Sequence, residues 1–171
     1  VPTADKPCFL ELKKKYKGIV FKRRISAPYT DIKSYMAGED NGIENSQILK
    51  EIDYFRRFYG CLKPAADIFY DREAFYDRTD SSVRLTFDSN VLARGWDLEL
   101  ENGIYGERVL ENGLYILEVK TPGAMPMWIA EMLNEFKIYP IPFSKYGTAY
   151  KNGLLTRENK KIITLGGEYC A

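Results

Sequence analysis

The stretch Val83–Asp88, with the sequence VRLTFD, decides the fold because apolar and polar residues alternate in it at every position. Successive side chains of a β-strand point to opposite faces, so Arg84, Thr86 and Asp88 share one face and the three apolar residues share the other. The pattern therefore predicts a strand with one apolar face for a core and one charged face.

Two further stretches, Phe9–Lys13 (FLELK) and Leu114–Lys120 (LYILEVK), show the same alternation. Each contains an acidic residue followed two positions later by a lysine, in the order Glu-x-Lys. A single half-buried strand with its charges in water explains any one of these stretches. Their recurrence indicates instead that several strands turn their charged faces toward one shared space.

The composition fits one soluble domain with a substantial core. The chain has 171 residues, of which 45% are hydrophobic and 29% are charged. Its 25 basic residues face 24 acidic ones, and the net charge of +1 gives no support for binding nucleic acid through bulk positive charge. No apolar run approaches the roughly 20 residues that cross a bilayer, so no membrane segment is expected.

The chain contains no histidine, which excludes Ser-His-Asp and Cys-His catalysis and histidine-bound zinc. A metal ion would therefore sit on carboxylate oxygens, which favour hard ions such as Mg²⁺ or Mn²⁺. The three cysteines, Cys8, Cys61 and Cys170, are widely spaced. Neither a disulfide framework nor a Cys-x-x-Cys metal site is expected, and a reducing, cytoplasmic setting is favoured.

Turn residues divide the apolar segments into short strands. A hairpin turn is expected at Lys17-Gly18, and a short peripheral hairpin is expected over 96–113, where two Asn-Gly pairs occur. The predicted strands are 8–16, 19–25, 68–72, 82–90 and 114–121.

Helical spacing of apolar residues predicts four helices. Thr30 is expected to cap the first, and Asn45 or Ser46 the second. The third begins at Pro126 and carries an apolar stripe, which we expect to pack on the apolar face of a sheet. The predicted helices are 30–37, 46–59, 126–136 and 147–151.

Five motifs occur in order along the chain: Glu11–Lys13 with Lys22–Arg24 and Ser26–Pro28, Tyr70–Phe75, Val83–Asp88, Leu117–Lys120, and Phe143–Tyr146. In this order they resemble the VTC domain, the polyphosphate polymerase branch of the triphosphate tunnel metalloenzymes in the CYTH-like superfamily. The resemblance implies an α+β fold, an antiparallel β-barrel of the triphosphate-tunnel type that is incomplete in this chain, with helices packed outside. Residues 1–171 are expected to form a single domain of this kind.

The resemblance also implies a role for each matching side chain around a basic lumen that holds phosphates. The residues implied in catalysis are Lys13, Lys22, Arg72, Arg84 and Lys145, and those implied in phosphate binding are Arg24, Tyr70, Lys120 and Ser144. Glu118, with Glu11, is implied as a ligand of Mn²⁺ or Mg²⁺, and an ion pair of Glu118 with Lys120 is the alternative. A second lysine that family members often carry is Pro142 here.

The implied reaction is transfer of the γ-phosphoryl group of ATP to the end of a polyphosphate chain, with release of ADP. Two alternatives stay open: a tunnel hydrolase acting on triphosphate or polyphosphate, and a catalytically silent module that binds polyphosphate or nucleotide.

Family members carry further strands before the Glu-x-Lys strand that this sequence lacks, and the chain begins at Val1, so we expect a fragment or a processed product. A barrel with missing strands has open edges, which predicts a homo-oligomer. Neither nucleic acid nor a membrane segment in this chain is expected.

Overall fold

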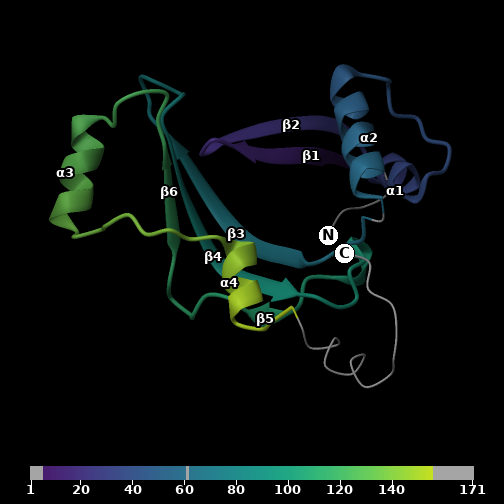
Figure 1. Cartoon of the computed structure of the whole chain (residues 1–171). Helices are drawn as coiled ribbons and strands as arrows, with labels where there is room; N and C mark the ends of the chain where they lie inside the picture. Colours follow the sequence, from purple (N-terminus) through teal and green to yellow (C-terminus); the bar gives the residue numbers. More distant parts are fainter. Residues whose placement is uncertain (1–5, 61, 156–171) are drawn as a thin grey trace. The chain divides into compact units, whose positions relative to one another are not determined.

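The computed structural model describes residues 6–60 and 62–155, which fall into two compact units (Figure 1). The first unit comprises residues up to Pro64 together with Glu99–Gly103. The second comprises Ala65–Leu98 and the described residues from Ile104 onward. Each unit has its own core, and that residues 1–171 act as a single domain stays a prediction.

The first unit is built on a long hairpin of two antiparallel strands, β1 (Pro7–Tyr16) and β2 (Ile19–Pro28). The predicted turn is confirmed, because Lys17 and Gly18 have φ angles of 48° and 81°. Positive φ at both central residues is what the tight two-residue hairpin turns of type I′ require.

Two helices, α1 (Tyr29–Ala37) and α2 (Gln47–Tyr59), lie at the end of the hairpin away from its turn (Figure 1). Their core consists of Leu12, Tyr35, Leu49 and Ile52. The predicted cap of α2 is confirmed: the Ser46 hydroxyl accepts a hydrogen bond of 3.2 Å from the backbone N–H of Leu49.

The predicted Thr30 cap of α1 is wrong, because the helix begins one residue earlier and Pro28 occupies the capping position. The backbone N–H of Tyr29 donates to the carbonyl of Lys6, at 3.3 Å, as a continuation of the hairpin ladder. The chain therefore enters the helix directly from β2, and no side-chain cap is needed to satisfy that donor.

The second unit is a four-stranded antiparallel sheet of β3 (Asp67–Tyr76), β4 (Arg84–Arg94), β5 (Glu107–Arg108) and β6 (Ile116–Lys120). β4 is central and pairs with all three others. Because directly paired residues lie on the same face of a sheet, the register fixes which side chains meet. It pairs Arg72 with Asp88 across β3 and β4, and it pairs Thr86 with Glu118 and Arg84 with Lys120 across β4 and β6.

Two helices contact β4 through different side chains. In α3 (Met127–Glu135), the fully buried Ile129 packs with Val83 and Leu85, so the predicted packing of this helix on the apolar face is confirmed. In α4 (Lys145–Lys151), Ala149 is fully buried against Val91. The charged face of β4 is on the side that α4 contacts, because Lys145 donates to Asp88.

The predicted hairpin over 96–113 is wrong, because this segment pairs with β4 instead of with itself. It forms a short 3-10 helix at Leu100–Asn102 and the strand β5 on the edge of β4. A Cβ on Gly106 would lie 2.6 Å from the carbonyl oxygen of Ala93, so only glycine permits this approach. Asn112-Gly113 lies in the connection between β5 and β6, which both pair with β4 and not with each other.

The α+β class with antiparallel sheets is confirmed, and helices lie against the sheets as expected. Neither sheet closes on itself within the described residues, which agrees with the expected incomplete barrel.

Candidate functional site

The residues that the sequence singled out form two groups, one in each unit. The group in the second unit shares the face of the sheet that carries Asp88, and we call it the polar face. It consists of Tyr70, Arg72, Arg84, Thr86, Asp88, Glu118 and Lys120 from β3, β4 and β6, with Lys145 from the start of α4.

Asp88 is the centre of the polar face, and its side chain is only 1% exposed. Arg72 donates two parallel hydrogen bonds to it, from Nε to Oδ1 at 2.6 Å and from Nη2 to Oδ2 at 2.7 Å. Lys145 donates from Nζ to Oδ2 at 2.5 Å. One buried carboxylate therefore binds two of the cations that the sequence implied in catalysis, which charge-assisted bonds make energetically possible.

The two cations change the ionisation of this carboxyl. Burial by itself raises the pKa of Asp88, but the hydrogen bonds from Arg72 and Lys145 outweigh burial and lower that pKa below its usual value. The bond to Asp88 likewise raises the pKa of Arg72. Asp88 and Arg72 are consequently both charged at neutral pH.

The ring of Tyr70 adds a second contact to both cations. The Arg72 guanidinium carbon lies 5.0 Å from the ring centroid and the Lys145 ammonium 4.4 Å from it, so both make cation–π contacts. Tyr70, Arg72, Asp88 and Lys145 thus form one cluster, and the sequence-based grouping of Tyr70 with Arg72 on one face agrees with it.

Arg84 differs from Arg72, the other arginine of the face, because no carboxylate pairs with it among the described residues. Its side chain is partly buried, its Nε has no hydrogen-bond partner, and its guanidinium lies over the ring of Tyr76 at 5.3 Å. The hydroxyl of Thr86, a residue 3% exposed, also lacks a partner. Buried polar groups of this kind normally have a partner, and these two have none among the described residues.

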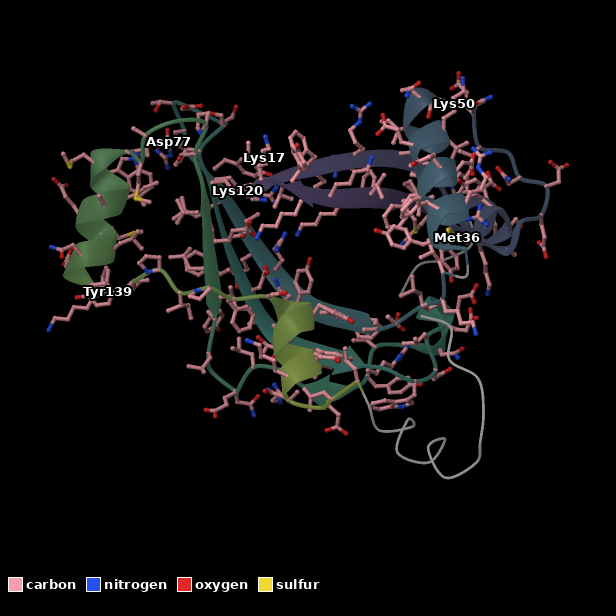
Figure 2. All side chains as sticks on the ribbon, viewed as in Figure 1. Lys17, Met36, Lys50, Asp77, Lys120 and Tyr139 are labelled. Atoms are coloured by element: carbon pink, nitrogen blue, oxygen red, sulfur yellow. The ribbon has the colours of Figure 1, made fainter. Side chains whose placement is uncertain are left out.

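Glu118 and Lys120 lie on the solvent side of the polar face. Glu118 Oε1 is 3.2 Å from Lys120 Nζ, and Glu118 Oε2 is 3.9 Å from Arg72 Nη2. The ion pair that was the alternative reading of these residues is therefore present. Figure 2 labels Lys120 on β6. The Glu118 side chain is 45% exposed, so its oxygens are also accessible to a ligand.

Ser144 has a structural contact of its own. Its hydroxyl accepts a hydrogen bond of 3.1 Å from the backbone N–H of Gly147 and caps α4. The cap fixes where the helix begins, and Lys145 is the first helical residue. The implied binding of phosphate by Ser144 stays a prediction.

The group in the first unit lies on one face of the β1–β2 hairpin and consists of Glu11, Lys13, Lys22 and Arg24. Lys22 pairs with Glu11 at 2.8 Å, and the Arg24 guanidinium lies over the ring of Phe9 at 4.4 Å. Lys13 and Lys22 are directly opposite each other in the ladder. All four residues are exposed, in contrast to Asp88.

The sequence analysis placed Asp88 on the charged face but gave it no role. Its signal was present in the alternation, because Asp88 shares the face of Arg84 and Thr86. What the sequence alone lacks is the register with Arg72 and the approach of Lys145, which is 57 residues away along the chain.

A family model of the VTC domain matches residues 1–153 of the sequence. The chain belongs to the VTC domain family. The family indicates a function related to polyphosphate, and its members are generally metal dependent. No curated protein matches the sequence. Among the residues that the structure describes, no helix is long and apolar enough to cross a membrane.

Glu118 is the accessible carboxylate of the polar face, because Asp88 is buried. Within residues 6–60 and 62–155, no three acidic or cysteine side chains come together as a preformed metal cage. Mg²⁺ is commonly held by one or two carboxylates together with phosphate oxygens and water. Glu118 already pairs with Lys120 and lies 3.9 Å from Arg72, and its implied role as a metal ligand stays a prediction.

Proposed function

We propose that this chain is a polyphosphate polymerase domain that transfers the γ-phosphoryl group of ATP to the end of a polyphosphate chain and releases ADP. The single observation that carries the proposal is Arg84, a partly buried cation without a carboxylate partner among the described residues. A cation in that position gains most from a ligand that brings negative charge, and a phosphate chain does so with oxygens that suit a planar guanidinium.

The reaction needs no covalent intermediate with the protein. A terminal oxygen of the polyphosphate chain attacks the γ-phosphorus of ATP, and the bond from that phosphorus to the β-phosphate oxygen breaks. Catalysis of such a transfer consists mainly of alignment and of neutralising charge on the transferred group. The absence of histidine is consistent with this chemistry.

Within this proposal, Arg72, Arg84 and Lys145 bind the phosphate oxygens on the polar face, and Lys120 adds charge at its edge. On the hairpin, Lys13, Lys22 and Arg24 are the proposed phosphate contacts. Glu118 is the proposed ligand of Mn²⁺ or Mg²⁺, which supplies further neutralisation of phosphate charge. Glu11 is the second proposed metal ligand, and like Glu118 it already pairs with a lysine, here Lys22 at 2.8 Å.

The test is an assay of the protein with ATP and Mn²⁺ or Mg²⁺, in which the products are separated by gel and by nucleotide chromatography. Lengthening chains together with ADP support the polymerase. Orthophosphate without chains would instead indicate a hydrolase, and retention of ATP or polyphosphate without turnover would indicate a silent binding module. The homo-oligomer stays a separate prediction, which the molar mass in solution tests.

A further inference from the structure

We propose that Asp88 is a positioning residue, which orients Arg72 and Lys145 toward one phosphate group without touching that phosphate itself. The proposal rests on the proposed function for the identity of the ligand. It goes beyond it because the family motifs imply roles for the cations and none for this carboxylate.

Asp88 holds both cations and leaves most of their hydrogen-bond donors unoccupied. A guanidinium carries five N–H donors, and Asp88 takes one from Nε and one from Nη2 of Arg72. An ammonium carries three donors, and Asp88 takes one from Lys145. The remaining donors of both side chains can bind an anion while the bonds to Asp88 persist.

Each of the two cations is held by more than one contact. Arg72 and Lys145 share the Asp88 carboxylate and also the ring of Tyr70, at 5.0 Å and 4.4 Å. Two contacts to each cation restrict its rotamer, which lowers the conformational entropy lost when a ligand binds. The carboxylate itself is 1% exposed and negative, so it is unsuited to contact a phosphate directly.

Positioning by Asp88 and simple charge balance predict different effects of removing its charge. Replacing Asp88 by asparagine makes the polar face more positive by one charge. If Asp88 only balanced charge, a phosphate chain would then bind more tightly. If it positions Arg72 and Lys145, the same substitution weakens binding, because two cations at one site lose the group that holds them in place. The two roles predict opposite signs.

The experiment measures binding of inorganic tripolyphosphate by calorimetry for the wild-type chain and for Asp88→Asn. We expect the dissociation constant of Asp88→Asn to rise about tenfold. The control is Asp71→Asn. Asp71 precedes Arg72 in β3, and its side chain lies on the opposite face of the sheet, so the substitution removes the same charge away from the cluster. Unchanged or tighter binding by Asp88→Asn, with wild-type-like unfolding, would overturn the proposal.

A double-mutant cycle with Arg72→Gln tests whether Asp88 acts through Arg72. We expect the combined loss of affinity to be smaller than the sum of the single losses, since Asp88 has only Lys145 left to orient once the guanidinium is gone. Additive losses would contradict the positioning role.

A third measurement does not depend on ligand. In ¹⁵N NMR spectra the Nε–H of Arg72 should be protected from solvent exchange in the wild type and lose that protection in Asp88→Asn. Protection that persists in the variant refutes positioning even where phosphate binds. A wild-type chain that shows the protected signal but binds no tripolyphosphate refutes the proposed function and leaves the orienting contact established.

If Asp88→Asn does not fold, Lys145→Met removes one of the two oriented cations while leaving the Arg72 pair, and an unchanged dissociation constant for that variant would overturn the proposal.

Discussion

The same acid-and-lysine motif occurs in both units, and its surroundings differ. On the hairpin, Glu11 pairs across the ladder with Lys22, and the face that carries them is exposed. On the sheet, Glu118 pairs with its own neighbour Lys120 and lies 3.9 Å from Arg72, next to the buried Asp88. The glutamate of the motif therefore belongs to a solvated ion pair with another strand in one place and to the edge of a partly buried network in the other.

The difference teaches that charge alone does not make a binding site specific. Exposed lysines attract a phosphate chain through long-range electrostatic interactions, which dissolved salt weakens, and such side chains keep many rotamers. On the polar face, Asp88 holds Arg72 and Lys145 before any ligand arrives, and preorganised charges contribute more to catalysis than mobile ones do. We therefore expect substitutions on the sheet to act on turnover and those on the hairpin to act on salt-dependent attraction.

The largest expected effect is that of Arg84→Ala. The Arg84 guanidinium is proposed to donate to the charge that develops on the transferred phosphoryl group in the transition state. Removing this donor should lower kcat/KM by an amount equivalent to about 2–4 kcal/mol. The measurement is the rate of polyphosphate synthesis from ATP. The matched control is Arg78→Ala, which removes an exposed arginine from the turn between β3 and β4. Equal rates for the two variants would remove Arg84 from the site.

Arg72→Lys is expected to have the next largest effect. The substitution keeps the charge and loses the two parallel bonds to Asp88, so we expect about a tenfold fall in kcat/KM with little change in the unfolding temperature. The matched comparison is Arg24→Lys on the hairpin, where the guanidinium contacts the exposed ring of Phe9. A larger loss at Arg24 than at Arg72 would reverse the ranking of the two regions.

The double substitution Lys13→Ala with Lys22→Ala should raise KM for polyphosphate at low salt. The rise corresponds to a loss of about 1 kcal/mol in binding free energy. The effect should vanish as ionic strength increases, because both side chains are exposed. Titration of KM against salt measures it. A loss that persists at high salt would show that the hairpin lysines are as closely engaged as the polar face.

The smallest effect concerns stability in acid. The pKa of Asp88 is lowered in the folded state, so its ion pairs contribute stability at pH values above its ordinary pKa of 3.8, and this contribution is lost as pH falls below that value. Asp88→Asn should therefore lose less stability than the wild type between neutral pH and pH values below 3.8. Urea unfolding at several pH values measures the difference, and parallel curves for the two proteins would contradict it.

Local signals in the sequence predicted local structure well. The Lys17-Gly18 turn, the Ser46 cap and the apolar stripe of α3 each depend on residues close together in the chain, and each is confirmed. The alternation in Val83–Asp88 correctly placed Arg84 and Asp88 on one face of a sheet.

Contacts between residues that lie far apart in the sequence could not be predicted from local patterns. The Thr30 cap failed because the ladder of β2 continues to Tyr29, and the 96–113 hairpin failed because β4 offered an edge for pairing. Asp88 had no role in the sequence analysis, because its two cations come from β3 and from α4. Register and helix docking are tertiary properties that alternation leaves open.

The Ser144 cap has a consequence for genetics. Because the hydroxyl decides where α4 starts, alanine at this exposed position should displace the ammonium of the next residue, whereas threonine should preserve the geometry. A saturation screen would then tolerate at this position only the side chains that cap a helix well, namely serine, threonine, aspartate and asparagine, and the cause of the intolerance would lie in backbone geometry.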